Sequence, residues 1–423
     1  MDEKLKEIIP ILEKYEQIHL IDFYDELDEN AKEDLIKQIK ETNLGFLNKL
    51  YLNSFKNDII DSKRISPIRY SSKFNMPKED REKYIQIGEN IIKQGKLAVI
   101  TLAGGMGSRL GFKGPKGSYE LEMPNEEKKK SLFEFICDKL KFANEKYNCC
   151  IPWYIMTSPS NDAKTKEYFE THNYFDYPKE KVHFFKQHTI HILDINGKVM
   201  LDNIGKLKRD SNGNGDVFQA FRENKLENTL EDIEWISVSG VDNILLEVVD
   251  PLFIGLSAHN KSKVASKSVS KKDLTAKTWV FANVDGKTDI INPIFLTDEM
   301  RFGREYNQIN ILAHLFTKEA FFKCSKLEIP YHRAFKKTDY INEEGMKMVV
   351  QEPNSFKFEK FIFDVFENFE NFTLLEVDES QEFAPIKAFT GMATPERALE
   401  MYEKKMKKNQ NKKWKINFSL LIL

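Results

Sequence analysis

Hydrophobic positions follow two different spacings along the chain. Residues 1 to about 92 are rich in Glu, Lys, Leu and Ile and poor in Gly, and stretches such as DENAKEDLIKQIKETN are typical of amphipathic helices. From Leu97 onward, short apolar runs alternate with helical patterns and turn signals. This alternation is typical of α/β proteins, in which helices join the strands of one sheet and pack on its faces.

Several elements are predicted individually within this second part. A capping box of Ser131 and Glu134 precedes an apolar stripe, so we expect a helix up to about Tyr147. Asn196-Gly197 and Asp285-Gly286 are dipeptides that favour hairpin turns. The runs predicted as strands are Leu97 to Leu102, Ile151 to Ser158, Val182 to Gln187 and Trp235 to Val241. Together they predict an α/β fold with a doubly wound, mixed but mostly parallel sheet.

Composition narrows the class of protein. A chain of 423 residues is too long for one core of the usual size, so two or three domains are expected. Its 64 basic and 66 acidic residues give a formal net charge of −2, which offers no general attraction to nucleic acid or to an anionic membrane. No apolar run reaches the length of a membrane span, and the start MDEKLKEIIP lacks the features of a signal peptide. We therefore expect a cytoplasmic protein.

The segment richest in chemical information is LAGGMGSRLGFKGPKG, residues 102–117, directly after a predicted strand. In open α/β sheets, ligands bind at the loops that follow the carboxyl ends of strands. Gly104, Gly105 and Gly107 would let the backbone approach a phosphate closely, and their amides would form an anion-binding concavity. The cations of Arg109 and Lys116 follow in the same loop. The pattern indicates a site for a nucleoside triphosphate.

Two other glycine-rich motifs do not match this loop. A dinucleotide fingerprint needs a third small residue where this chain has Leu110. A Walker loop needs Ser or Thr after its lysine, whereas Lys116 lies between Pro115 and Gly117.

The pattern LAGGxGxRLG followed by PKG resembles the eukaryotic-type UDP-N-acetylhexosamine pyrophosphorylases, within the wider family of UTP:sugar-1-phosphate uridylyltransferases. Five more stretches resemble the same family in the same order, and the resemblance covers roughly residues 90 to 390. They are PWYIMTS (152–158), NGNG (212–215), VDNILLEVVDPLFIG (241–255), KFEKFIFDVF (357–366) and EFAPIK (382–387). The resemblance implies a nucleotidyltransferase fold, Rossmann-like and GT-A-like. It divides the chain into a helical region in residues 1–92, a catalytic core in 93–330 and a C-terminal region in 331–423.

The activity that the resemblance implies is transfer of a uridylyl group from UTP to a sugar 1-phosphate, with release of pyrophosphate. The attacking phosphate oxygen is already ionised near neutral pH, so positioning and charge neutralisation are the tasks of the protein. Residues implied to act on the reacting phosphates are Arg109, Lys116 and Lys387. Those implied to bind UTP are Leu102, Ala103, Gly104, Gly105, Lys116, Gln187, Gly213, Asp242 and Lys357. Those implied to contact the sugar are Asn214, Asn292, Asn310 and Lys387.

A metal ligand is expected at Asp242. This residue follows the predicted strand that begins at Trp235, so its carboxylate should emerge at the same edge of the sheet as the glycine loop. Mg²⁺ uses one or two protein carboxylates together with substrate phosphates and water. The resemblance gives Asp242 the role of Mg²⁺ ligand.

The sequence departs from the family at the sugar. In the hexosamine enzymes a Glu-Tyr pair contacts the sugar, and this chain has Asn292-Pro293 at that place. The Ser and the Asn of the family's FSPLKN run are Ala384 and Ala388 here. N-acetylglucosamine 1-phosphate is the expected substrate. The alternatives are a uridylyltransferase for glucose or galactose 1-phosphate, a broad UDP-sugar pyrophosphorylase, and a nucleotide-sugar sensor without catalysis.

Overall fold

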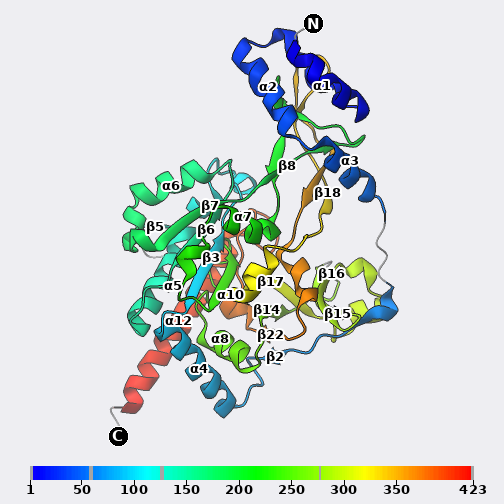
Figure 1. Cartoon of the computed structure of the whole chain (residues 1–423). Helices are drawn as coiled ribbons and strands as arrows, with labels where there is room; N and C mark the ends of the chain where they lie inside the picture. Colours follow the sequence, from blue (N-terminus) through cyan, green and yellow to red (C-terminus); the bar gives the residue numbers. More distant parts are fainter. Residues whose placement is uncertain (1–2, 57–60, 124–127, 276–277, 421–423) are drawn as a thin grey trace. The chain divides into compact units, whose positions relative to one another are not determined.

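The computed structural model describes residues 3–56, 61–123, 128–275 and 278–420, with side chains described as far as residue 408 (Figure 1). The chain divides into two compact units, each of which combines three separate segments. Unit 1 consists of Met1–Ile59, His188–Asp216 and Glu328–Ile362, and unit 2 of Ile60–Gln187, Val217–Leu327 and Phe363–Leu423. The expected regions 1–92, 93–330 and 331–423 do not coincide with these units. Within the described part of the chain, no helix is long and apolar enough to cross a membrane.

Unit 2 contains a mixed sheet of eleven strands. Its main row has the order β2-β22-β14-β17-β13-β3-β6-β7. Only β17 runs antiparallel to its neighbours in this row, so the predicted mostly parallel sheet is confirmed. The bounds are β2 (Ser71–Ser72), β22 (Phe372–Glu376), β14 (Val264–Ser270), β17 (Gln308–Thr317), β13 (Trp235–Gly240), β3 (Leu97–Leu102), β6 (Trp153–Thr157) and β7 (Val182–Lys186).

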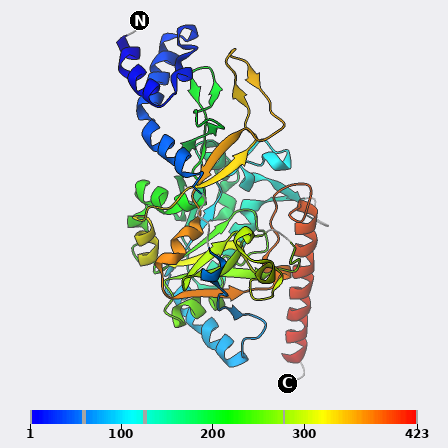
Figure 2. The ribbon, with the colours of Figure 1, turned by 90° about the vertical axis from the view of Figure 1, so that its right-hand side faces the viewer.

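Strands β3 and β6 lie inside the sheet and are apolar along most of their length. Every residue of β3 and of β6 is buried, which is typical of parallel strands with both faces covered. The four strands predicted from apolar runs are β3, β6, β7 and β13, with ends that agree to within two residues. The helices of unit 2 are α4 (Lys78–Lys93), α5 (Leu132–Tyr147), α6 (Asp162–Thr171), α7 (Val217–Glu223), α8 (Pro251–His259), α9 (Asp298–Phe302), α10 (Lys318–Cys324), α11 (Glu379–Glu382) and α12 (Pro395–Leu420). Figure 2 shows α12 as the long helix at the red end of the colour scale.

Local sequence signals explain where several elements begin and end. The Ser131 hydroxyl accepts a hydrogen bond from the Glu134 amide, and the Glu134 carboxylate accepts one from the Ser131 amide, so the predicted capping box starts α5. Asp285 and Gly286 both have positive φ and join β15 (Val280–Val284) to β16 (Lys287–Ile291) in the predicted hairpin. The shorter strands of unit 2 are β1 (Ile65–Ser66), β4 (Glu120–Glu122) and β5 (Lys129–Ser131).

Strand β17 is irregular at the edge of the sheet where β13 ends. Its register with β14 shifts between the pairs Ser266–His314 and Ser268–Asn310. Leu312, within this shift, has a φ of 54°, and the Asn310 side-chain oxygen accepts a hydrogen bond of 2.8 Å from its amide. Asn310 therefore stabilises a backbone conformation that is unfavourable for leucine.

Unit 1 is a small α/β body with its own core. Three helices pack on short strands, and their apolar contacts include Leu12, Ile36, Leu193 and Phe358. The helices are α1 (Glu3–Lys14), α2 (Glu29–Glu41) and α3 (Leu44–Asn53). The strands are β8 (Thr189–His191), β9 (Leu193–Asp194), β10 (Leu201–Asn203), β11 (Lys206–Leu207), β12 (Arg209–Ser211), β18 (His332–Lys336), β19 (Tyr340–Ile341), β20 (Lys347–Met348) and β21 (Ser355–Glu359). The helices predicted before residue 57 thus belong to unit 1, whereas α4 belongs to unit 2.

Candidate functional site

The glycine loop leaves β3 at Leu102 and folds back on itself. The Gly107 amide donates to the Gly114 carbonyl at 3.0 Å, and the Lys116 amide donates to the Gly105 carbonyl at 3.0 Å. The side-chain amide of Asn161, which is almost fully buried, donates to the Ala103 carbonyl at 2.9 Å and to the Gly105 carbonyl at 3.1 Å. These bonds hold the loop in one conformation at the carboxyl end of the strand.

Gln187 lies against the glycine loop. A Cβ atom on Gly104 would be 1.9 Å from the Gln187 side-chain nitrogen, so a larger residue at this position would displace the Gln187 side chain. Gln187 is buried at the end of β7, and its backbone amide donates to the Thr157 carbonyl at 2.9 Å. The structure thus places Leu102, Ala103, Gly104 and Gln187 in one group.

Lys116 and Asp242 form an ion pair at the carboxyl ends of two parallel neighbours, β3 and β13. The Lys116 ammonium lies 2.9 Å from the Asp242 carboxylate, and both side chains are less than one-fifth exposed. Burial raises the pKa of Asp242, but the charges of Lys116 and Lys387 outweigh this effect and hold the pKa below its ordinary value. Asp242 is therefore ionised at neutral pH.

Lys387 reaches the same place on a segment that pairs with the Asp242 region. The Ile386 amide donates to the Asp242 carbonyl at 3.0 Å. Asn243 and Pro385 form an isolated antiparallel β-bridge. The Asn243 side chain accepts a hydrogen bond of 2.9 Å from the Ala384 amide. Asn243 therefore supports the segment that carries Lys387.

The remaining predicted residues of unit 2 differ in their surroundings. Arg109 is an exposed residue of the glycine loop. Asn310 lies in the irregular part of β17, at the edge where β13 ends and near Asp242, because a Cβ atom on Gly240 would contact both Leu312 and Asp242. Asn292 caps the turn that follows β16, where its side-chain oxygen accepts a hydrogen bond of 3.2 Å from the Ile294 amide.

Gly213, Asn214 and Lys357 belong to unit 1 and lie around one loop of that unit. Gly213 has a φ of 90°, and a Cβ atom there would be 2.4 Å from the Lys360 carbonyl. The Asn214 side-chain oxygen accepts a hydrogen bond of 2.9 Å from the Ile362 amide. The Lys357 ammonium lies 2.9 Å from both Asp210 and Glu359. Burial lowers the pKa of Lys357, but these two carboxylates outweigh it and raise the pKa.

Sequence reasoning did not find the residues that hold these loops in place. Asp216 has a fully buried side chain, and its carboxylate accepts hydrogen bonds from the His188 amide and from the Asn212 side chain. Asn161 binds the carbonyl oxygens of the glycine loop. Asn161 is distant in sequence from the loop that it binds, and Asp216 is distant from His188, so no local pattern marks these two contacts. The only signal for Asp216 is its position directly after the NGNG run.

The candidate ligand site combines one carboxylate, Asp242, with the lysines Lys116 and Lys387. Asp242 is paired with Lys116 and is stabilised by the charge of Lys387, at the sheet edge where α/β proteins bind nucleotides. Lysine ammonium groups bind phosphate as point charges, and a single carboxylate suits a Mg²⁺ ion that is shared with phosphate oxygens. The residues present therefore fit a magnesium-bound polyphosphate.

Comparison with known proteins identifies the family of this chain. A family model described as UTP–glucose-1-phosphate uridylyltransferase matches residues 45–420. UDP-N-acetylglucosamine pyrophosphorylase of Saccharomyces cerevisiae is 34% identical over 358 residues, which cover 79% of this chain and 73% of the yeast protein.

Two solved structures share the fold. The putative UDP-N-acetylglucosamine pyrophosphorylase of Entamoeba histolytica has a TM-score of 0.72 and 30% identity, over 78% of this chain and 86% of that chain. The corresponding enzyme of Trypanosoma brucei, solved in complex with an inhibitor, has a TM-score of 0.78 and 24% identity, over 95% of this chain and 84% of that chain. With a family match that spans most of its length, this chain belongs to the UTP–glucose-1-phosphate uridylyltransferase family.

Proposed function

We propose that this chain is a uridylyltransferase that joins UTP and a sugar 1-phosphate into a UDP-sugar and pyrophosphate, with N-acetylglucosamine 1-phosphate as the preferred sugar substrate. The observation that supports the reaction best is the group formed by Lys116, Asp242 and Lys387, which comes from three separate parts of the chain. The choice of sugar is supported by the relatives from yeast and Entamoeba, which are named UDP-N-acetylglucosamine pyrophosphorylases.

The reaction requires charge neutralisation rather than proton transfer. An ionised oxygen of the sugar phosphate forms a bond to the α-phosphorus of UTP. The bond from that phosphorus to the bridging oxygen breaks, and its electron pair leaves with pyrophosphate. The protein has to hold two polyanions in line and to stabilise the charge that develops between them.

The cations of unit 2 have distinct positions for this task. Lys116 is held by the turn after Pro115 and faces Asp242, so it is proposed to contact the phosphates of UTP. Arg109 is exposed on the same loop and is proposed to face the phosphates when UTP binds. Lys387 is proposed to contact the phosphate of the sugar. A Mg²⁺ ion bound at Asp242 would neutralise phosphate charge and help to orient UTP.

The uridine end of UTP is proposed to lie along Leu102, Ala103, Gly104 and Gly105, with Gln187 beside the base. The Gln187 amide suits uracil, because both offer hydrogen-bond donors and acceptors. Gly213 is proposed to lie beside the uracil, Asn214 beside the sugar and Lys357 near the phosphates. These three assignments stay predictions from the family resemblance.

A second candidate is a uridylyltransferase of altered sugar choice, acting on glucose or galactose 1-phosphate. The supporting observation is Asn292, which has a neutral side chain bound to its own turn where the family has a charged glutamate. Ala384 and Ala388 also lack the polar groups of the family. Both changes remove hydrogen-bonding groups that a sugar pocket would use.

The experiment that tests both candidates is a pyrophosphate-release assay with Mg²⁺ and UTP. N-acetylglucosamine, glucose and galactose 1-phosphates are each supplied, and other nucleoside triphosphates serve as controls. We expect turnover with UTP and highest kcat/KM with the N-acetyl substrate. Binding of UTP without release of pyrophosphate in the presence of any of the three sugar 1-phosphates would support a nucleotide-sugar sensor and contradict the enzyme.

A further inference from the structure

Unit 2 contains a cluster of buried charged side chains at the start of the segment that leads to Lys387. Lys267 on β14 and Glu382 at the end of α11 are each 1% exposed, and Asp250 before α8 is 4% exposed. The Lys267 ammonium lies 2.5 Å from the Glu382 carboxylate and 2.7 Å from the Asp250 carboxylate. The Lys73 ammonium lies 2.7 Å from the second oxygen of Glu382. Glu382 is therefore held by two lysines from different elements.

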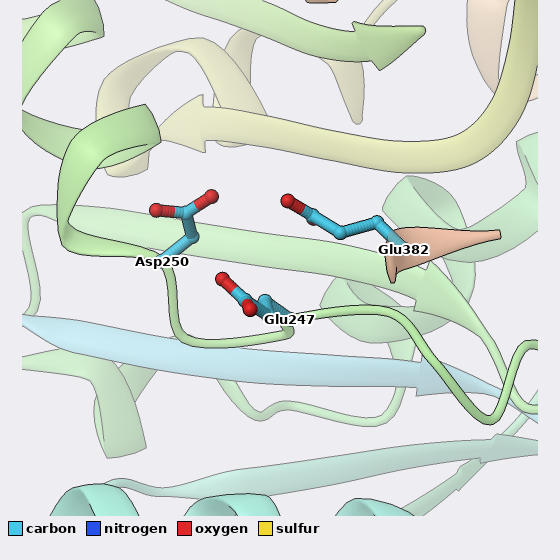
Figure 3. A group of neighbouring side chains, drawn as sticks. All are labelled: Glu247, Asp250 and Glu382. Atoms are coloured by element: carbon cyan, nitrogen blue, oxygen red, sulfur yellow. The ribbon is translucent and has the colours of Figure 1, made fainter. Parts of the chain in front are cut away.

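The carboxylates of this cluster also resemble a cation site. Oxygen atoms of Glu247, Asp250 and Glu382 lie within 4.8 Å of one another (Figure 3). Two ammonium groups, however, already lie among them, since Lys73 also approaches Glu247 and Asp250 at 3.8 and 3.7 Å. Burial opposes ionisation of both Lys267 and Glu382, but the opposite charges outweigh it, so the pKa of Lys267 is raised and that of Glu382 is lowered. The Lys405 ammonium lies 3.6 Å from the Glu247 carboxylate, so three ammonium groups offset the three carboxylates of the cluster.

Stability alone is a weak reason to keep such a cluster. Desolvating two charges costs several kcal/mol per ion, so a buried ion pair contributes little compared with apolar residues of the same size. Its geometry is nevertheless specific, because removing one partner leaves another charge buried and unpaired. The cluster is better explained by what it positions.

The backbone that follows Glu382 runs directly to the proposed reaction centre. The Glu382 carbonyl accepts a hydrogen bond of 2.8 Å from the Asn243 side chain. The Ala384 amide donates a hydrogen bond to the side-chain oxygen of Asn243, and the Ile386 amide donates one to the Asp242 carbonyl. The next residue is Lys387. Glu382 is thus the fixed start of a short segment that is paired with the Asp242 region along its length.

We propose that Glu382 is a positioning residue for uridylyl transfer: anchored by Lys267 and Lys73, it sets where Lys387 stands beside Asp242. The inference rests on the proposed function, because it assigns Lys387 to the reacting phosphates. Glu382 itself is buried and acts through Lys387. A displacement of about 1 Å at a group that orients the reacting atoms costs on the order of 10²-fold in rate, so a distant anchor has a measurable effect.

The test uses Glu382→Gln in the full chain and compares it with a matched buried control. Thr373→Val removes the buried hydrogen bonds that Asn260 and Ser262 make with Thr373 on β22, away from Lys387. Both variants are expected to lower Tm. Glu382→Gln should lower kcat/KM for pyrophosphate release by at least about tenfold, whereas Thr373→Val should stay within about threefold. Equal losses of activity at equal losses of Tm would overturn the proposal.

A double-mutant cycle with Lys387→Met separates positioning from general destabilisation. If Glu382 acts through Lys387, Glu382→Gln should change the remaining activity of Lys387→Met by less than about twofold. Losses that multiply in the double variant would overturn the proposal. A wild type without turnover, or a Lys387→Met variant of full activity, would instead contradict the proposed function.

Two further measurements keep the test decisive. If Glu382→Gln does not fold, Glu382→Asp keeps the charge and shortens the side chain by one methylene, and it enters the same cycle with the same expectation. Mg²⁺ alone should leave the Tm difference between wild type and Glu382→Gln unchanged. A Mg²⁺-dependent rise in Tm that Glu382→Gln abolishes would assign the carboxylates to a cation and overturn the proposal.

Discussion

Lys116 is proposed to contact the phosphates of UTP, and substituting it tests that role directly. It lies in a rigid turn, pairs with Asp242 and is largely buried, so its charge is positioned before substrate arrives. We expect Lys116→Ala to lower kcat/KM by about 10²-fold or more, the usual effect of removing one preorganised electrostatic group. Lys113→Ala, at an exposed lysine of the same loop, is the matched control and should change the rate by less than about twofold. A loss below about threefold in Lys116→Ala would show that its ammonium does not meet the phosphates.

Asp242 is expected to be required for magnesium-dependent turnover. Asp242→Asn keeps the size of the side chain and removes the charge, so the fold should persist while pyrophosphate release is lost at every Mg²⁺ concentration. Thermal unfolding followed by circular dichroism checks the fold, and a Mg²⁺ titration of the rate checks the function. Near-normal kcat in this variant would contradict the assignment of Asp242 as the metal ligand.

Asn292 should influence sugar choice if the family resemblance holds at this position. Asn292→Glu restores the charged acceptor of the family, so we expect the ratio of kcat/KM for N-acetylglucosamine 1-phosphate to that for glucose 1-phosphate to increase. Ile294→Ala, at an exposed neighbour in the same turn, is the control. The expectation fails if the wild type already prefers the N-acetyl substrate by more than about 10³-fold and Asn292→Glu leaves that ratio unchanged.

Residues of the glycine loop could be anticipated from the sequence, but their supports could not. A glycine marks a close approach, and the structure gives Gly104 such an approach to Gln187. Asn161 donates to a backbone carbonyl far away in sequence, and the Glu382 carbonyl accepts a hydrogen bond from the distant Asn243 side chain; a single sequence contains no periodic signal for either bond. Asn292 was expected to contact the sugar, and the structure shows its side chain in a local cap, which leaves that role a prediction.

At the scale of elements, helix α5 is tied to the backbone beside Asp242 through Lys139. The Lys139 ammonium donates a hydrogen bond of 2.6 Å to the Ile244 carbonyl. Burial, followed by the charge of Lys405, lowers the pKa of Lys139 to about 7. A lysine in the unfolded chain has a pKa of about 10.4, so between these values the unfolded chain binds more protons and stability rises with pH. Below about pH 7 the buried Lys139 side chain is charged in the folded protein, and this charge lowers the free energy of unfolding by its full amount.

Lys139→Met should therefore remove a pH-dependent contribution to stability. The free energy of unfolding of the wild type, relative to Lys139→Met, should increase as the pH rises from about 7 to about 10. Urea unfolding at several pH values measures this difference, and Lys164→Met, on the exposed face of α6, provides the baseline. A difference that does not vary with pH would show that Lys139 keeps its proton in the folded protein throughout this range.

The elements best predicted from sequence are those with a strong local signal. The apolar run of β3 and the capping box of α5 identify both elements with their observed first residues. The irregularity of β17 could not be predicted, because the register shift that contains Leu312 depends on pairing with β14, which is distant in sequence. Tertiary pairing there overrides the backbone preference of leucine.

At the scale of the whole molecule, the sequence predicts more than one domain but not which segments form each. Periodicity is a local property, whereas each unit joins segments that lie far apart in the chain. The expected division in chain order assigned residues 1–92 to one helical region, and the structure divides that region between α1 to α3 of unit 1 and α4 of unit 2.

Deleting residues 1–56 tests the independent core of unit 1. The deletion removes α1 to α3 and uncovers apolar side chains that they bury, including Ile190, Leu193 and Phe358. We expect stronger binding of an environment-sensitive apolar dye and a lower Tm than for the full chain, because newly exposed apolar surface costs about 25 cal/mol per Å². Unchanged dye binding together with an unchanged Tm would show that the helices do not cover this core.

Because unit 1 is built from three separate segments of the chain, it can be completed only late in protein synthesis. Its core joins Leu12 and Ile36, near the start of the chain, to Phe356 and Phe358 on β21. During translation, α1 to α3 emerge before unit 2 and remain without these partners while most of unit 2 is being made. Residues of α1 to α3 thus reach their final contacts later than many residues that follow them in the chain. The core of unit 1 is completed only after β21 has been translated.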